Sequence, residues 1–558
     1  MKTITIELKG QYSEIGPQVK GIDLSATKRF RLDRFFELIE LTIKNRSIKK
    51  VLIHRREGFA VPAFGGVEEI YLGLKRLKDA GKELFYYAPE YEMVDCVLGS
   101  IATQRIIHPL GQVSFFGIGF TSLFFKKLLD KHSIDVEVIR RGKYKSAADT
   151  VRCDEYDQYA RKQYQTLADG VVEIMRDTVT GSSESAYTQS LLDEMLSGEK
   201  VFTASEAVKQ GLVDQLRTVD DLSNEWQKEK IKKVAIKKYK GQFGSGAKIA
   251  VLVFEGMIID GENRRHPLFG QAIGDKSMIS SIRALGKNRK IKAVVFRINS
   301  GGGSAIASEN ILRELIALND KKPVVISMGP VAGSGGYWIS TTGRRLFALP
   351  STVTGSIGVL SLYFNFAEVL RKHGITADSV KSGDLADFAS ALRPLSETEY
   401  NNIDHITGHL YEEFIERVAK ARNLSIKRVD ELGEGQVFLG KDADEMDLVD
   451  DLGGLYDAID YAKELIRTKK ATIVFKPKVK IPFLMKLLSA KQSGAAFYDG
   501  IKGTDTLHNS MANISQPLTP ISLVKACLSL HGKTLFIDPF LQSFLEKRDT
   551  DVFNRDDS

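Results

Sequence analysis

The sequence predicts an α/β protein in which one domain of roughly 200 residues occurs twice. Three observations support this prediction. The 558 residues are 43% hydrophobic and 27% charged, as in ordinary globular domains. Short runs of β-branched residues alternate with stretches of helical periodicity, which is typical of parallel strands joined by helical crossovers. Two long segments of the chain also match each other without a gap.

The internal match has a spacing of 241 residues, at which Arg56 aligns with Arg297. Residues 201–216 (VFTASEAVKQGLVDQL) also match residues 437–452 (VFLGKDADEMDLVDDL) at a spacing of 236. A period of this length excludes a solenoid. We therefore expect an N-terminal segment at 1–45, a first repeat at 46–223, a Lys- and Gly-rich linker at 224–246, a second repeat at 247–468 and a C-terminal extension of unknown role at 469–558.

The elements of the second repeat can be assigned in order. Residues 294–298 (VVFRI) predict a strand, residues 308–318 a helix and residues 323–328 (PVVISM) a second strand. A further helix is expected to begin near Gly333. Each of the two strands is followed directly by a glycine-rich loop, and the loops read RINSGGGSA and GPVAGSGGYW.

Composition excludes several classes of protein. Three widely spaced cysteines exclude a disulfide framework and a CxxC site. The net charge of +8 is a modest excess, and no basic stretch interleaved with aromatic residues supports nucleic-acid binding. The first 16 residues lack the apolar core of a signal peptide, and no window reaches about 18 consecutive apolar residues.

Ser334 is the candidate nucleophile of this sequence. It stands among small residues in GPVAGSGGYW, between a predicted strand and a helical stretch. Glycines in this position allow a sharp turn, leave the hydroxyl uncovered and let backbone N–H groups approach a substrate carbonyl. The loop matches neither GxxxxGK[ST] nor GxGxxG, so a nucleotide site is disfavoured.

A nucleophilic serine needs a base, and the sequence leaves two kinds open. His373 is 39 residues beyond Ser334, and spacing alone does not exclude a histidine triad. His405 and His409 lie four residues apart without the glutamate of HExxH, so we interpret them as core or surface residues rather than zinc ligands. The alternative is a lysine whose pKa is lowered by burial.

At the level of motifs, the chain resembles the long-form signal peptide peptidase (SppA, protease IV) family. In the second repeat the resemblance rests on KIAVLVFEGMIIDG, RINSGGGS, GPVAGSGGYW and STVTGSIGVLS, and in the first on LLDKHSIDVEVIRRGKYKSAAD. It covers about residues 45–465. It implies tandem ClpP/crotonase-like domains and a serine endopeptidase that cleaves peptides, such as remnant signal peptides, through an acyl-enzyme without metal or cofactor.

The resemblance assigns the nucleophile to Ser334 and the general base to Lys145 of YKSA. The repeat spacing supports a divided site, because Lys145 aligns with Ala386 and Ser334 aligns with Met93. Each repeat therefore lacks one half of the pair. Lys143 is a rival base two residues away, which we interpret as a solvated lysine.

Supporting roles also follow from the resemblance. Ser356 of TGSIG matches a serine that orients the base, and the N–H groups of Gly302 and Gly335 match an oxyanion hole. Gly301 stands where relatives usually have a proline. Because glycine does not fix φ as proline does, we expect a looser loop before Gly302.

Two other functions remain open from the sequence, a crotonase-like acyl-CoA enzyme and a non-catalytic scaffold. The resemblance implies a homo-oligomer, expected to be a tetramer. Long-form relatives commonly carry an N-terminal membrane anchor that this sequence lacks, so localisation stays open. Residues 478–491 (KVKIPFLMKLLSAK) could lie on an anionic membrane surface, although a packed helix is favoured. The charged end of the chain is expected to be disordered.

Overall fold

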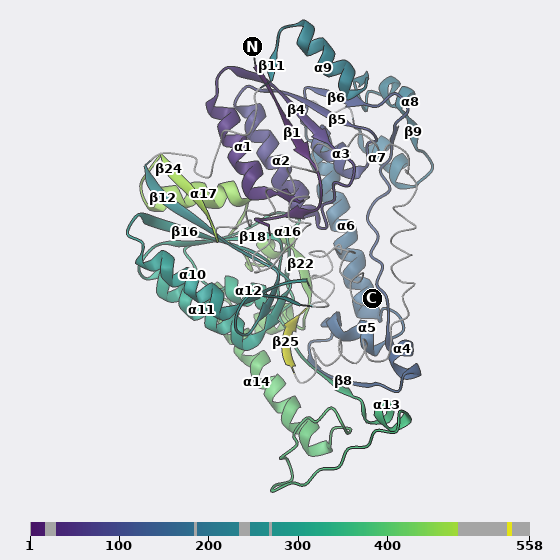
Figure 1. Cartoon of the computed structure of the whole chain (residues 1–558), viewed down its shortest axis with the longest axis vertical. Helices are drawn as coiled ribbons and strands as arrows, with labels where there is room; N and C mark the ends of the chain where they lie inside the picture. Colours follow the sequence, from purple (N-terminus) through teal and green to yellow (C-terminus); the bar gives the residue numbers. More distant parts are fainter. Residues whose placement is uncertain are drawn as a thin grey trace, which may run out of the picture.

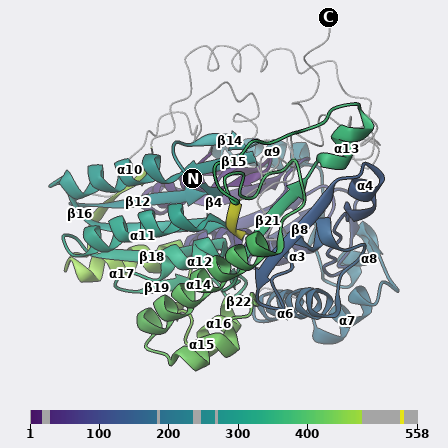
Figure 2. The ribbon, with the colours of Figure 1, turned by 90° about the horizontal axis from the view of Figure 1, so that it is seen from below.

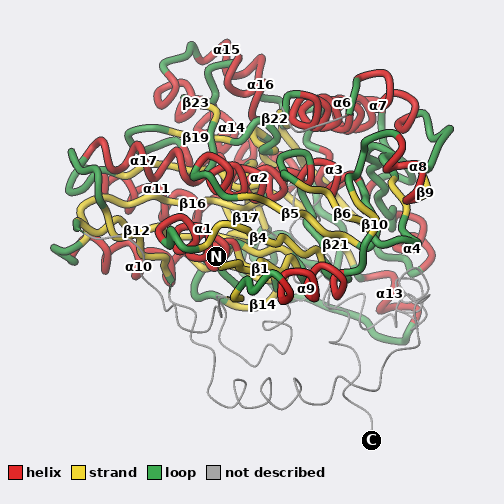
Figure 3. Tube along the Cα trace, turned by 90° about the horizontal axis from the view of Figure 1, so that it is seen from above, coloured by secondary structure: helices red, strands yellow, loops and turns green. Residues whose placement is uncertain are grey.

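Two sheets, one built largely by each repeat, organise the chain (Figure 1). The computed structural model describes residues 2–16, 29–182, 187–233, 246–266, 270–477 and 533–537. Strands run through the middle of the molecule and helices lie around them (Figure 3). The prediction of an α/β fold with a duplicated, largely parallel sheet is confirmed.

The first repeat forms a six-stranded sheet in which every neighbouring pair is parallel. Its order is β10 (Gln215–Leu216), β6 (Gln104–Ile107), β5 (Glu83–Ala88), β4 (Ile48–Arg55), β1 (Lys2–Leu8) and β11 (Lys232–Lys233). The helices of this half are α1 (Leu32–Lys44), α2 (Phe64–Asp79), α3 (Met93–Gly99), α4 (Lys126–Lys131), α5 (Asp149–Arg152), α6 (Gln158–Thr180), α7 (Gln189–Leu196), α8 (Ala204–Lys209) and α9 (Val219–Lys228). In α1 the apolar residues recur at helical spacing and are buried, which is why this segment packs as a helix.

The second repeat forms an eight-stranded sheet. Its strands are β22 (Val437–Leu439), β20 (Val353–Gly355), β18 (Val324–Gly333), β16 (Ile291–Ser300), β12 (Ala247–Glu255) and β24 (Ala471–Lys476), with β19 (Leu346–Ala348) on β18 and β23 (Asp451–Leu452) on β19. Its helices are α10 (Asp275–Lys287), α11 (Ala305–Asn319), α12 (Gly335–Ser340), α13 (Ala367–Lys372), α14 (Glu397–Arg422), α15 (Ile426–Leu432), α16 (Gly440–Glu445) and α17 (Leu455–Leu465). The run β23–β19–β18–β16–β12–β24 repeats the order β10–β6–β5–β4–β1–β11, so the duplication is visible in the topology.

The largest hydrophobic core lies between the two repeats. It holds Ile4 of the first sheet together with Val251 and Val295 of the second. The intervening residues of the same strands, such as Leu252 and Phe296, face a second core on the opposite side of the sheet. Because both faces are buried, these strands appear in the sequence as nearly continuous apolar runs.

A third sheet joins the repeats and leads to the site. Its order is β14 (Arg264–His266), β15 (Gly270–Gly274), β13 (Met257–Ile259), β17 (Gly302–Ser304), β25 (Lys533–Ile537), β21 (Val359–Asn365) and β8 (Asp135–Arg141). Only β8 comes from the first repeat, and it pairs antiparallel with β21 along its whole length. Small pairs β2 (Tyr12–Ser13) with β3 (Phe30–Arg31) and β7 (Gln112–Val113) with β9 (Phe202–Thr203) complete the described strands.

The expected domain boundaries at residues 45 and 468 each separate strands that belong to the same sheet. Residues 1–45 supply β1 and α1, and β24 extends the second sheet beyond residue 468. The expected linker begins within α9 and includes β11. Residues 478–491, Cys527 and the charged C-terminal end lie outside the described residues. Among the described helices, none is both long and apolar enough to cross a membrane.

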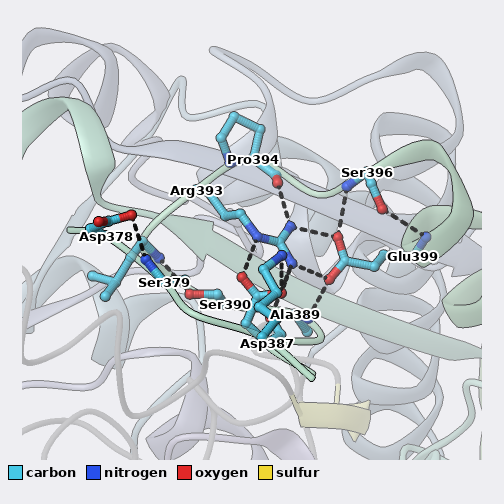
Figure 4. A network of polar contacts seen from close by, with 11 residues as sticks. Asp378, Ser379, Asp387, Ala389, Ser390, Arg393, Pro394, Ser396 and Glu399 are labelled. Carbon is cyan, nitrogen blue, oxygen red and sulfur yellow. Dashed lines mark hydrogen bonds and ion pairs between the residues drawn. The ribbon is translucent and has the colours of Figure 1, made fainter. Parts of the chain in front are cut away.

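Residues 374–396, which we call the arm, project from the body of the molecule between α13 and α14 (Figure 1). Arg393 holds the base of the arm through a polar network (Figure 4). Its guanidinium donates to both carboxylate oxygens of Asp387 and of Glu399, at 2.6 to 2.8 Å. The hydrogen bonds from Arg393 lower the pKa of Glu399 to about 2.

Candidate active site

Ser334 occupies the sharp turn between β18 and α12, two elements that are labelled in Figure 2. Its backbone has φ +54° and ψ −117°, a conformation that costs a residue with a Cβ about 1–3 kcal/mol. The Ser334 N–H donates to the carbonyl of Gly355 at 2.8 Å, and the Ser334 carbonyl accepts from Trp338 N at 2.8 Å. A Cβ on the next residue, Gly335, would lie 2.7 Å from Ser308 Oγ, so the turn leaves no room for a larger residue there. The glycines of this loop therefore permit the close packing that its sequence predicts.

Lys145 reaches the second repeat from the loop that follows β8. Tyr144 N donates to the carbonyl of Glu434 at 2.9 Å, and Arg140 Nη1 donates to the carbonyl of Lys145 at 3.0 Å. The loop also packs against Gly435, whose φ is +78°, and a Cβ there would lie 2.7 Å from Lys145 Cβ. A glycine in one repeat thus sets the approach of a lysine from the other.

The side chains of Lys145, Ser334 and Ser356 meet in one cluster. Lys145 Nζ lies 2.7 Å from Ser334 Oγ, and 2.9 Å from both the hydroxyl and the carbonyl oxygen of Ser356. All three residues are 0% exposed. Ser356 is held in a positive-φ turn (φ +52°), and its N–H donates to the carbonyl of Gln436 at 2.6 Å. At 2.7 Å an amine and a hydroxyl can exchange a proton directly.

The other candidate bases lie elsewhere. Lys143 forms an ion pair with Glu434 and is half-exposed, and the hydrogen bond that it donates to this carboxylate raises the pKa of Lys143. His373 Nδ1 lies 2.8 Å from the carbonyl of Val369 in α13. His405 and His409 are exposed on α14. Within the described part of the chain, no cluster of three or more His, Cys, Asp or Glu side chains could hold a metal ion.

Gly302 and Gly335 adjoin each other beside Ser334. A Cβ on Gly335 would lie 3.3 Å from Gly302 Cα. Gly302 has φ +110°, and its N–H donates to Ser300 Oγ at 3.2 Å. Gly335 is the first residue of α12, where backbone N–H groups lack partners within the helix. The structure therefore brings together all five residues that the sequence analysis placed at the site.

Sequence reasoning missed a buried ion network that supports β18. Arg297 on β16 pairs with Glu14 at 3.0 Å and with Glu69 at 2.8 Å, and all three side chains are at most 1% exposed. Arg297 Nη1 also donates to Ser327 Oγ at 3.0 Å and to the carbonyl of Met328 at 2.7 Å. The repeat alignment singled out Arg297. Its partners come from the N-terminal segment and from α2, and no sequence pattern connects either of these segments with Arg297.

Two further buried carboxylates cross between the repeats. Glu68 on α2 accepts hydrogen bonds from the backbone N–H of Ser351, at 3.0 Å, and from its hydroxyl. Glu255 on β12 accepts from Ser13 Oγ and from Glu14 N, each at 2.9 Å. Burial raises the pKa of Glu68 and that of Glu255 to about 7 in each case. Burial at this interface therefore favours the protonated form of both carboxyl groups.

Comparison with known proteins gives a consistent picture. A family model described as Peptidase family S49 matches residues 76–233 and 316–469. Over 456 residues the chain is 32% identical to Protease 4 of Haemophilus influenzae, covering 75% of this chain and 70% of that protein. It is 34% identical over 421 residues to Protease 4 of Salmonella typhi, covering 72% and 67%. A solved structure of a ClpP1 mutant from Listeria monocytogenes is 15% identical, covers 38% of this chain and 94% of that one, and superposes with a TM-score of 0.24.

Proposed function

Because the chain belongs to peptidase family S49 and is a serine peptidase, we propose that Ser334 and Lys145 form its catalytic dyad. The observation that carries the proposal is the 2.7 Å contact between Ser334 Oγ and Lys145 Nζ. The two residues are 189 positions apart and come from different repeats, yet they meet in a fully buried cluster within one chain. The repeat alignment supports the same division, since each repeat lacks the partner residue.

Lys145 must be a neutral amine to act as the base. Complete burial disfavours the charged ammonium form, and the two contacts with Ser356 hold the nitrogen facing Ser334. In the proposed reaction Nζ takes the hydroxyl proton as Oγ attacks a peptide carbonyl carbon. Lys145 then gives this proton to the leaving amine. A water molecule, deprotonated by Lys145 in turn, hydrolyses the acyl-enzyme.

The backbone N–H groups of Gly302 and Gly335 are the proposed donors to the oxyanion. They adjoin each other beside Ser334, and a donor of this kind lowers the barrier by about 3 kcal/mol. The Gly302 N–H would exchange its 3.2 Å contact with Ser300 Oγ for the stronger bond to a charged oxygen. Gly301, which precedes Gly302 and does not fix φ as a proline would, should favour this exchange.

The substrates that fit this site are extended peptides, with remnant signal peptides as the proposed natural class. A bound peptide in extended conformation would pair with strands next to Ser334, and its side chains would enter pockets on alternate sides. The proposed reaction uses neither a metal nor a cofactor.

Substitution of each half of the dyad tests the proposal. Ser334→Ala and Lys145→Ala should each abolish hydrolysis of a fluorogenic peptide ester, while Lys143→Ala, two residues away and exposed, should retain it. A fluorophosphonate should label Ser334 in the unaltered protein, which is not expected of an acyl-CoA hydratase. Substantial activity in either dyad variant, with folding verified by circular dichroism, would contradict the dyad.

We also propose that the protein assembles with copies of itself, through the arm. The arm exposes large apolar side chains, among them Val380, Phe388 and Leu392, which is unusual for a surface that faces only water. Phe388→Glu should shift the sedimentation coefficient of the protein toward that of the monomer. An unchanged coefficient would show that the arm does not carry the assembly.

A further inference from the structure

A strand from the C-terminal extension lies beside the candidate active site. β25, the yellow strand beside β21 in Figure 2, is inserted between β17 and β21 and is antiparallel to both. Neighbouring strands lie about 4.8 Å apart, so β17 and β21 are separated by about 10 Å, the room that one extended strand needs. We call this space the strand slot. Without β25, both of its walls would present unpaired backbone N–H and C=O groups.

The strand slot is bordered by the proposed catalytic machinery. Gly302, a proposed oxyanion donor, is the first residue of β17 and is in register with Ile537 of β25. On the opposite wall, β21 begins three residues after Ser356. The other neighbour of β21 is β8, the strand that leads to Lys145. A strand in the slot therefore lies between β17, which holds Gly302, and β21, whose other neighbour leads to Lys145.

We propose that residues Lys533–Ile537 occupy the position of a substrate peptide and keep the protease self-inhibited. This inference rests on the proposed function, because it takes the strand slot as the place where a substrate pairs. β25 runs toward Gly302, so Ile537 is the residue of β25 that stands in register with this proposed oxyanion donor, which adjoins Gly335 next to Ser334. Ser334 and Lys145 are both 0% exposed in this arrangement. A peptide substrate has to displace β25 before it can pair with β17 and β21.

The backbone of β25 offers a selective perturbation. Successive residues of a strand direct their N–H groups toward opposite neighbours, so Leu535→Pro and Phe536→Pro each remove a donor from a different wall of the slot. Leu535→Val keeps the N–H and is the matched control. None of these substitutions replaces a residue of the proposed catalytic machinery.

The first measurement does not depend on catalysis. In the full chain carrying Ser334→Ala, a fluorescein-labelled peptide with the sequence of residues 532–538 (GKTLFID) is titrated and followed by anisotropy. If β25 fills the slot about 90% of the time, adding Leu535→Pro should tighten binding about tenfold relative to adding Leu535→Val. Equal dissociation constants would overturn the inference.

The second measurement separates this inference from the proposed function. With Ser334 intact, the proline variants should show a KM about tenfold lower and an unchanged kcat on a fluorogenic peptide, as expected when an internal competitor is removed. An unchanged KM would overturn self-inhibition. Tighter peptide binding without hydrolysis by any variant would instead refute the proposed function and leave occupancy of the slot standing. Failure of both proline variants to fold, judged by circular dichroism, would show that β25 is structural and would also overturn the inference.

Discussion

Gly435→Ala is the sharpest test of how the fold positions Lys145. At this residue a Cβ would lie 2.7 Å from Lys145 Cβ, where an ordinary contact between carbons is about 3.5 Å or more. The lysine loop would therefore have to retreat by about 0.8 Å. A shift of this size would lengthen the 2.7 Å contact between Lys145 Nζ and Ser334 Oγ beyond hydrogen-bond range.

The expected loss follows from the geometry. A misplacement of about 1 Å costs a reaction about 100-fold in rate, which corresponds to about 2.7 kcal/mol in the barrier. We expect Gly435→Ala to lower kcat on a fluorogenic peptide by about this factor. The substitution should also lower the free energy of unfolding by about 1–2 kcal/mol, because φ +78° is unfavourable for alanine.

Gly81→Ala supplies the matched control. Gly81 has φ +73°, almost the value at Gly435, but a Cβ there would have nothing within 4 Å. Gly81→Ala should therefore show the loss of stability that the positive φ alone causes, measured by urea denaturation, with an unchanged kcat. If Gly435→Ala retained a kcat within about threefold of that of Gly81→Ala, the contact with Gly435 would not set the position of Lys145, and the reasoning would be refuted.

Two further predictions concern the interface between the repeats. The pKa of Glu68 is raised to about 7, so its stabilising contribution is complete below about pH 4.5 and is lost as the pH rises through 7. Glu68→Gln mimics the protonated form and should therefore flatten the rise in urea midpoint between pH 8 and pH 5. Glu255 would still contribute its own part of this pH dependence. An undiminished pH dependence in Glu68→Gln would contradict the role of Glu68. Arg297→Met would leave two buried carboxylates without their cation and should cost about 3–5 kcal/mol, seen as a lower urea midpoint. Arg313→Met, at an exposed pair, should change stability by less than about 1 kcal/mol, and equal effects of the two substitutions would refute the assignment.

Local features of the fold could be read from the sequence because they depend on neighbouring residues. The strand predicted at 294–298 lies within β16, and the helix predicted at 308–318 lies within α11. The glycine-rich loop around Ser334 forms the expected turn, since only small residues fit beside Ser300 and Ser308. The alternation and periodicity of apolar residues, and the residue types of turns, depend on positions close together in the chain, so they can be recognised in the sequence.

Other features escaped the sequence because their partners lie far along the chain. The sequence did not indicate that β1 and β24 join sheets whose other strands are distant in sequence. The network around Arg297 was missed because Glu14 is 283 residues away. β25 was missed because pairing between β17 and β21 depends on a slot that exists only once the third sheet has formed.

The sequence by itself determined that one domain occurs twice and that the proposed nucleophile and the proposed base are divided between the copies. The spacing of 241 residues is enough to show that Met93 and Ala386 stand where a partner would be. Only the tertiary structure decided that the two halves meet. β8 of the first repeat pairs with β21 of the second, and this pairing carries Lys145 across to Ser334. The physical reason is that a strand's own residues specify its conformation, whereas its partner is chosen by burial and hydrogen bonding across the whole fold.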